Sequence, residues 1–162
     1  MYGEMGMPQD FEKLQNIMPM ELGELPKDFE KADELLLRAG KLGCAKAYFN
    51  LGYSYDNGRG VEVNIRKAKH YWELAAMGGH VRARHNLGCE EVRAGNYHRA
   101  MKHFILSARA GYKDALDEVG IGFKRGYVTK DEYANTLRAY QQGHDEAKSD
   151  LRDESFVLNL IL

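Results

Sequence analysis

The sequence predicts an all-α solenoid built from helix-turn-helix repeats. Two observations carry this prediction: a pattern of small and apolar residues recurs at intervals of one helical hairpin, and Gly-containing turns separate the segments that bear it. The pattern is Gly, three residues, Ala, three residues, then Leu or Val followed by Gly. It occurs as Gly43/Ala47/Leu51/Gly52, Gly79/Ala83/Leu87/Gly88 and Gly111/Ala115/Val119/Gly120, with spacings of 36 and then 32 residues.

Each repeat contains two predicted helices, named helix A and helix B in chain order. Small and apolar residues recur at steps of four in helix A, which places them on one stripe. The predicted A helices span about 44–56, 80–94 and 112–124, and the predicted B helices about 27–40, 65–77, 97–110 and 130–142. Turns between A and B are expected at Asn57-Gly58-Arg59-Gly60, Gly95-Asn96 and Gly126-Tyr127, where Gly can end a helix in a left-handed conformation.

Glycine inside a helix needs a compensating contact, because it costs about 1 kcal/mol relative to Ala. We expect Gly52, Gly88 and Gly120 to allow close approach of a neighbouring helix, with bulky residues such as Tyr71, Trp72 and Phe104 opposite. The predicted packing positions are Ala47, Leu51, Gly52, Ala68, Trp72, Ala83, Leu87, Gly88, Ala100, Phe104, Ala115, Val119 and Gly120.

The two ends depart from the pattern. Residues 1–25 contain Met7-Pro8 to Lys13, a near copy of Leu25-Pro26 to Lys31, and form a partial repeat, a short capping helix or an arm. The solenoid is expected over 26–152, ending in a partial fourth copy, Gly143/Ala147/Leu151, that caps the array. Residues 153–162 are an apolar tail that either covers the last repeat or docks on another copy or another subunit.

Composition narrows the possible functions. Charged residues make up 29% of the chain and nearly cancel at a formal charge of -1, without the basic cluster that nucleic acid requires. No apolar run approaches the length of a membrane span, and we expect no secretory signal. The two cysteines, Cys44 and Cys89, are expected to be reduced thiols, which indicates the cytoplasm or another reducing compartment.

One stretch carries a family resemblance. Residues Gly43-Cys-Ala-Lys-Ala-Tyr-Phe-Asn-Leu-Gly-Tyr-Ser-Tyr-Asp-Asn-Gly-Arg-Gly-Val61, continuing through Lys67-Ala68 to Ala75-Ala76, resemble the Sel-one-like repeat of the tetratricopeptide superfamily. The later copies lack the Gly-x-Gly-Val loop and look closer to ordinary tetratricopeptide repeats. The resemblance implies a right-handed α/α superhelix, a scaffold or adaptor role, a protein or peptide partner and no cofactor.

No residue set predicts catalysis or a metal site. The closest histidine pairs, His80/His85 and His98/His103, are five residues apart and therefore lie well round a helix from each other. Cys89 lacks the oriented base and oxyanion site of a catalytic cysteine, and Gly58-Arg-Gly60 lacks the strand that precedes a phosphate loop.

The candidate binding surface is the concave side that tetratricopeptide relatives line with helix A. Alignment on the Leu-Gly pair predicts that it carries Lys46, Phe49, Tyr53, Asp56, Arg82, His85, Cys89, Val92, Asp114, Asp117, Ile121 and Lys124. Phe49, Tyr53 and Arg82 are the preferred anchors, because aromatic and Arg side chains supply most interface hot spots. The alternative for Phe49 and Tyr53 is packing inside the repeat. The alternative function is a small constitutive subunit of a larger assembly.

Overall fold

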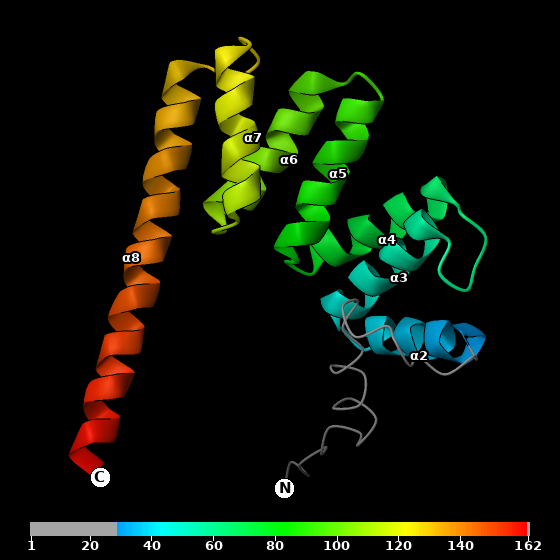
Figure 1. Ribbon diagram of the computed structural model, residues 1–162, viewed down its shortest axis with the longest axis horizontal. Coiled ribbons are helices and arrows are strands. Elements are labelled where there is room, and N and C mark those ends of the chain that lie inside the picture. The colour runs from blue at the N-terminus through cyan, green and yellow to red at the C-terminus, as the bar shows by residue number, and fades with distance from the viewer. Residues whose placement is uncertain (1–28, 162) are drawn as a thin grey trace, which may run out of the picture. The chain divides into compact units, whose positions relative to one another are not determined.

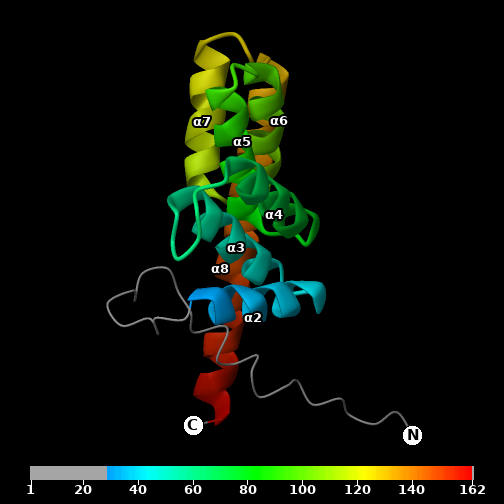
Figure 2. The same cartoon turned by 90° about the vertical axis from the view of Figure 1, so that its right-hand side faces the viewer.

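The computed structural model describes residues 29–161, including the side chains of residue 29 and of residues 31–147. All of the regular structure in this part of the chain is α-helical, which confirms the predicted all-α class (Figures 1 and 2). The helices are α2 (Phe29–Lys41), α3 (Ala45–Asn57), α4 (Ile65–Met77), α5 (Val81–Arg93), α6 (Tyr97–Arg109), α7 (Lys113–Lys124) and α8 (Lys130–Ile161).

The helices alternate as predicted, with α3, α5 and α7 in the position of helix A. They belong to two compact units, Met1–His80 and Val81–Leu162. In the first unit, α3 packs against α2 and α4. In the second unit, α6 packs between α5 and α7, and α8 packs on α6 and α7. Each unit encloses its own apolar core, centred on Leu36, Ala39, Ala47 and Leu51 in the first and on Phe104, Ala115 and Val119 in the second.

Left-handed glycines make the turns. Gly43, Gly79 and Gly111 end the B helices with φ of 98°, 86° and 93°, and Gly95 and Gly126 end two A helices with φ of 78° and 81°. The residue after Gly111, Tyr112, donates its N–H to Ser107 O at 3.2 Å, and Gly111 donates to Ala108 O at 2.9 Å. These paired bonds satisfy carbonyls that the helix end would leave unpaired. The glycines therefore close each hairpin without burying orphan backbone groups.

Aromatic rings of helix B fill the gaps left by helix A glycines. A Cβ added to Gly52 would collide with the indole of Trp72, and one added to Gly88 would lie 2.6 Å from the ring of Phe104. Both rings are almost wholly buried, at 2% and 1% exposure. Gly52 and Gly88 are needed because a ring from the partner helix occupies the space that a side chain would take.

In the third repeat, the prediction that Gly120 allows close approach of a neighbouring helix is wrong. This residue is only half-buried, and the nearest atom to an added Cβ is the Tyr133 hydroxyl at 3.7 Å, which is ordinary contact. The close approach lies two residues further on, at Gly122, whose added Cβ would collide with the Met101 sulfur. The other twelve predicted packing residues are all buried.

Helix α8 also differs from the prediction. It begins with a capping box, in which the Thr129 N–H donates to Glu132 Oε2 at 2.8 Å and the Glu132 N–H donates to Thr129 Oγ1 at 3.2 Å. A helix ending near 142, followed by a separate capping segment, was expected. Gly143 instead keeps a helical conformation, and α8 continues to Ile161, since neither Pro nor a further Gly follows Gly143 to end it. The predicted N-terminal segment, 1–25, lies outside the described residues.

Two glycine substitutions are expected to change stability in opposite directions. Gly52→Ala should destabilise the fold by about 1–3 kcal/mol through overpacking against Trp72, less the roughly 1 kcal/mol gained in helix propensity. Gly120→Ala has room for its methyl group and should stabilise the helix by about 0.5–1 kcal/mol. Urea unfolding followed by circular dichroism measures both. Equal effects of the two variants would contradict this description of the packing.

Candidate functional site

The predicted helix A face, which comprises the twelve residues aligned above, is divided between core and surface. Phe49 is 5% exposed and stacks on His80, with ring centroids 4.3 Å apart. Of the two placements left open for Phe49, the structure shows the interior one. Because the ring of Phe49 is buried against His80, it is unavailable as a surface anchor.

Tyr53 lies one turn further along α3 and is half-exposed. The Arg59 guanidinium lies over its ring at 4.7 Å from the centroid, and Arg59 Nη2 donates to Tyr53 Oη at 3.5 Å. Arg59 occupies the Gly-x-Gly loop, which turns at Gly58 and Gly60 with φ of 66° and 69°. The loop thus holds a cation against an aromatic ring, an attractive contact at a partly exposed site.

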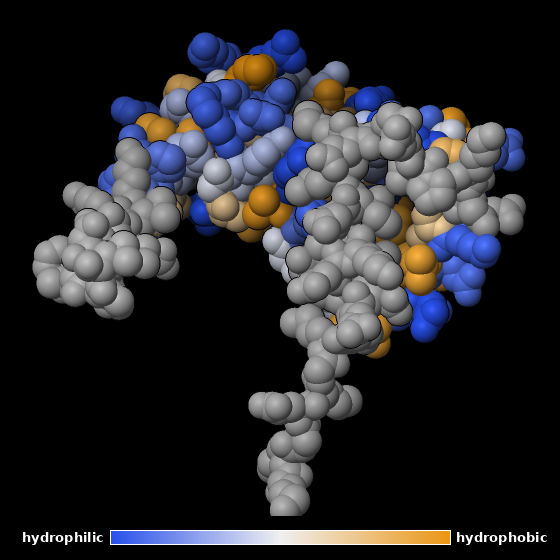
Figure 3. Space-filling view, turned by 60° about the horizontal axis from the view of Figure 1, so that its bottom comes forward, coloured by the Kyte–Doolittle hydropathy of each residue, from blue (hydrophilic) through white to orange (hydrophobic). Residues whose placement is uncertain are grey.

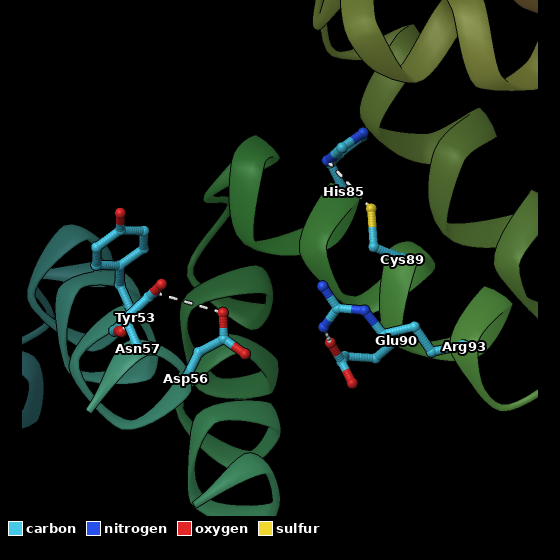
Figure 4. Close-up of polar contacts among 7 residues, drawn as sticks. All are labelled: Tyr53, Asp56, Asn57, His85, Cys89, Glu90 and Arg93. Carbon is cyan, nitrogen blue, oxygen red and sulfur yellow. Dashed lines mark hydrogen bonds and ion pairs between the residues drawn. The ribbon is translucent and has the colours of Figure 1, made fainter. Parts of the chain in front are cut away.

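Polar groups surround Tyr53 on the same helix. Asn57 Nδ2 donates to Tyr53 O at 3.0 Å and to Asp56 Oδ2 at 3.4 Å (Figure 4). Lys46, two turns before Tyr53, is half-exposed. In the first unit the helix A face therefore presents one aromatic ring among charges of both signs.

In the second unit, α5 and α7 together bear a polar cluster. Arg82 and Asp114 are exposed, and both act on Tyr112, which lies just before α7. Burial is the main factor that raises the pKa of the Tyr112 hydroxyl. Hydrogen bonding to Asp114 and its negative charge raise the pKa further, whereas the charge of Arg82 lowers it. The structure thus brings Arg82 and Asp114 together around Tyr112, a residue that sequence analysis missed because it lies outside the repeated columns.

His85 and Cys89 lie on the same face of α5. The His85 ring packs 5.2 Å from both the Phe104 and the Tyr112 ring centroids, and Cys89 Sγ lies 3.8 Å from His85 Nδ1 (Figure 4). Burial raises the pKa of the Cys89 thiol, and the carboxylate of Glu118 raises it further. A catalytic cysteine requires the opposite shift. The Cys89–His85 contact therefore lacks the lowered thiol pKa that a catalytic cysteine requires.

The remaining positions of the face lie on α7 and at the end of α5. Asp117 forms an exposed ion pair with Lys113 at 2.9 Å, and Ile121 is 43% exposed. Lys124 is exposed, whereas Val92 packs against the core of the second unit. An exposed ion pair of this kind contributes at most about 1 kcal/mol. The helix A face thus offers a partner four kinds of accessible side chain, namely an aromatic ring, a cation, a carboxylate and an aliphatic group. They belong to Tyr53, Arg82, Asp114 and Ile121.

The described residues form neither a metal-ligand cluster nor a membrane-spanning helix. Among them, no three or more His, Cys, Asp or Glu side chains are grouped so that they could hold a metal ion. No helix of this part of the chain combines the length and apolar character that crossing a membrane requires.

The hairpins, their Gly-based turns and their ring-into-glycine packing define a tetratricopeptide-like helical repeat protein. The sequence model of the Sel1 repeat matches residues 20–44, 45–80 and 82–112, and the chain belongs to the Sel1 repeat family. The match boundaries fall next to Gly43, Gly79 and Gly111, where the structure turns. The hairpin of α7 and α8 lies beyond the matched residues.

Relatives share the repeats over part of their length. A Sel1-like repeat-containing protein of Acanthamoeba polyphaga mimivirus is 38% identical over 63 residues, which cover 39% of this chain and 12% of that protein. A chitin synthase regulator of Saccharomyces cerevisiae is 42% identical over 50 residues, which cover 31% of this chain and 7% of that protein. The chain thus matches only a small part of either curated relative.

Two solved structures are similar to about two thirds to three quarters of the chain. A Sel1 repeat protein from Oxalobacter formigenes superposes with a TM-score of 0.62 and 28% identity, over 75% of this chain and 52% of that one. A protective antigen of uropathogenic Escherichia coli strains, with the same type of fold, gives a TM-score of 0.58 at 24% identity, over 68% of this chain and 25% of that one. The second likeness shows the fold alone.

The reactivity of Cys89 tests the electrostatics of this face. In a Cys44→Ser variant, alkylation of Cys89 should follow a pH–rate profile whose inflection lies above that of an ordinary thiol, because burial and Glu118 disfavour the thiolate. Adding Glu118→Gln removes a negative charge and should move the inflection to lower pH. Protein unfolded in urea gives the reference profile. An inflection below that reference would indicate an activated thiol and contradict the assignment.

Proposed function

We propose that this chain is a non-catalytic scaffold that binds a protein or peptide partner on the helix A face. Sel1 repeats generally serve as scaffolds for protein–protein interactions, which supports the class of function. The observation that carries the choice of surface is the cluster formed by Arg82 on α5, Asp114 on α7 and Tyr112 just before α7. It brings groups from two successive A helices together in the second unit.

The chemistry of the face indicates the kind of partner. Charges of both signs, one half-exposed Tyr and a half-buried His-aromatic cluster suit a polypeptide segment with mixed charges and at least one apolar side chain. On the side of the molecule shown in Figure 3, apolar residues of the described part lie in separate spots among charged ones. A surface of this composition favours a reversible, partly polar contact over a permanently buried one.

The absence of catalysis is part of the proposal. Its support is the raised pKa of the Cys89 thiol, which is opposite to the shift that a catalytic cysteine requires. Both cysteines are free thiols, which supports a reducing compartment such as the cytoplasm. No cofactor is required for the proposed role.

Capture experiments with surface variants test the choice of face. Partner capture by the full chain should fall at least tenfold in Tyr53→Ala and in Arg82→Glu, because each removes an anchor or reverses a charge on the face. Arg99→Glu makes the same charge reversal at an exposed position of helix B and should leave capture unchanged. Retained capture in the Tyr53 and Arg82 variants, with loss in Arg99→Glu, would contradict the proposal.

Phe49→Ala separates core from surface. Because its ring is buried against His80, this substitution should cost about 3–5 kcal/mol of stability, whereas Tyr53→Ala should cost much less. Thermal unfolding of the two variants compares them directly. Similar losses for both would mean that Tyr53 also belongs to the core and should not be used as a binding probe.

A second candidate function is a structural subunit of a larger assembly. The observation that favours it is the length of α8, which runs well past the ends of α6 and α7 (Figure 1). Such an extension offers contact surface independent of the helix A face. The capture experiment distinguishes the two functions, since an assembly contact through α8 would be insensitive to Tyr53 and Arg82.

A further inference from the structure

The joints between successive repeats follow one rule, and the last joint breaks it. At each of the first three joints, Gly43, Gly79 and Gly111 adopt left-handed conformations. A small residue lies four positions before each glycine, and an Ala lies four positions after it. These flanking residues are Ala39 and Ala47, Ala75 and Ala83, and Ser107 and Ala115, and all six are at most 3% exposed.

The fourth joint has the same residues in a different state. Gly143 is flanked by Ala139 and Ala147 at the same spacing, but it stays helical, so the chain does not turn. Ala139 is half-exposed and Ala147 is exposed. An added Cβ at Gly143 would meet no atom within 4 Å. Ala139 and Ala147 are therefore accessible at the fourth joint, whereas the corresponding residues are buried at the first three joints.

The open surfaces continue an existing interface. Thr136, which is fully buried where α8 packs on α6 and α7, begins a stripe that helical spacing carries through Tyr140 and Gly143 to Ala147. Leu151 follows one turn later in sequence. At 1.5 Å per residue, residues 144–161 extend α8 by about 27 Å. Figures 1 and 2 show this half of α8 running beyond α6 and α7.

A straight α8 cannot cover its own Ala139 with residues 144–161, but a second α8 can. We propose that two copies of this chain pair through α8, antiparallel and centred on Gly143. At the joints between α2 and α3 and between α6 and α7, the helix A of the next repeat packs beside helix B. In the dimer, residues 144–155 of one copy take that position beside residues 131–142 of the other copy. Ala139 of one copy faces Ala147 of the other, twice in one symmetric dimer. This is an exchange of one element between identical chains, with Gly143 as the hinge.

Light scattering on the full chain tests the pairing. The unmodified chain should be a dimer at micromolar concentrations. Ala147→Arg should shift it to a monomer of unchanged helicity, because residue 147 is exposed in the single chain and has room for a longer side chain. Gln141→Arg introduces the same charge at an exposed position on the opposite side of α8 and should remain dimeric. A monomeric unmodified chain, or equal behaviour of the two variants, would overturn the proposal.

Disulfide trapping tests the geometry. In a Cys44→Ser and Cys89→Ser background, chains carrying Ala139→Cys should crosslink only when mixed with chains carrying Ala147→Cys. Like residues would be about 12 Å apart along the helix axis, too far for a disulfide. A single chain carrying both substitutions should also form an interchain bond. An intrachain bond in a monomer would show that α8 folds back at Gly143 and would overturn the proposal.

Discussion

The contact on which the rest of the structure depends is the insertion of an aromatic ring from helix B into the gap left by a glycine on helix A. Trp72 over Gly52 and Phe104 over Gly88 place a large side chain against bare backbone, so two helices approach closely while burying a large apolar surface. The glycine costs helix propensity, and the ring more than offsets that cost. In these two hairpins, the buried ring sets how closely helix A and helix B approach each other.

Much of this arrangement can be predicted from the sequence because the same residue pattern occurs in several repeats. The helix ranges, the Gly-based turns and the buried small residues follow from residue types that recur at equivalent positions of successive repeats. The predictions fail where the information is not repeated. In the third repeat, the glycine at the close approach is Gly122 rather than Gly120, because the residue that faces it is Met101 of the preceding helix B. The repeated pattern contains no residue that would indicate this change. Alignment also left Phe49 either on the surface or in the repeat interior, because spacing alone cannot distinguish the two sides of a helix that is packed on both. The structure places it in the interior.

The same reasoning explains why Gly143 was expected to turn and does not. Glycine permits a left-handed conformation without imposing it, and no Pro or further Gly follows Gly143 to end the helix. Tyr112 illustrates the converse. It lies outside every repeated column, yet it organises the polar cluster of Arg82 and Asp114. Functional chemistry in a repeat protein is concentrated at positions that vary between copies, because the repeated positions are committed to packing.

The most direct test of the ring-into-glycine contact is a double-mutant cycle between Gly52→Ala and Trp72→Leu, measured as the free energy of unfolding in urea. Trp72→Leu removes the indole that an alanine at position 52 would strike. The account predicts that Gly52→Ala destabilises the native protein but becomes neutral or stabilising in the Trp72→Leu background, with a coupling of at least about 1 kcal/mol. Additive effects, with Gly52→Ala equally costly in both backgrounds, would contradict it.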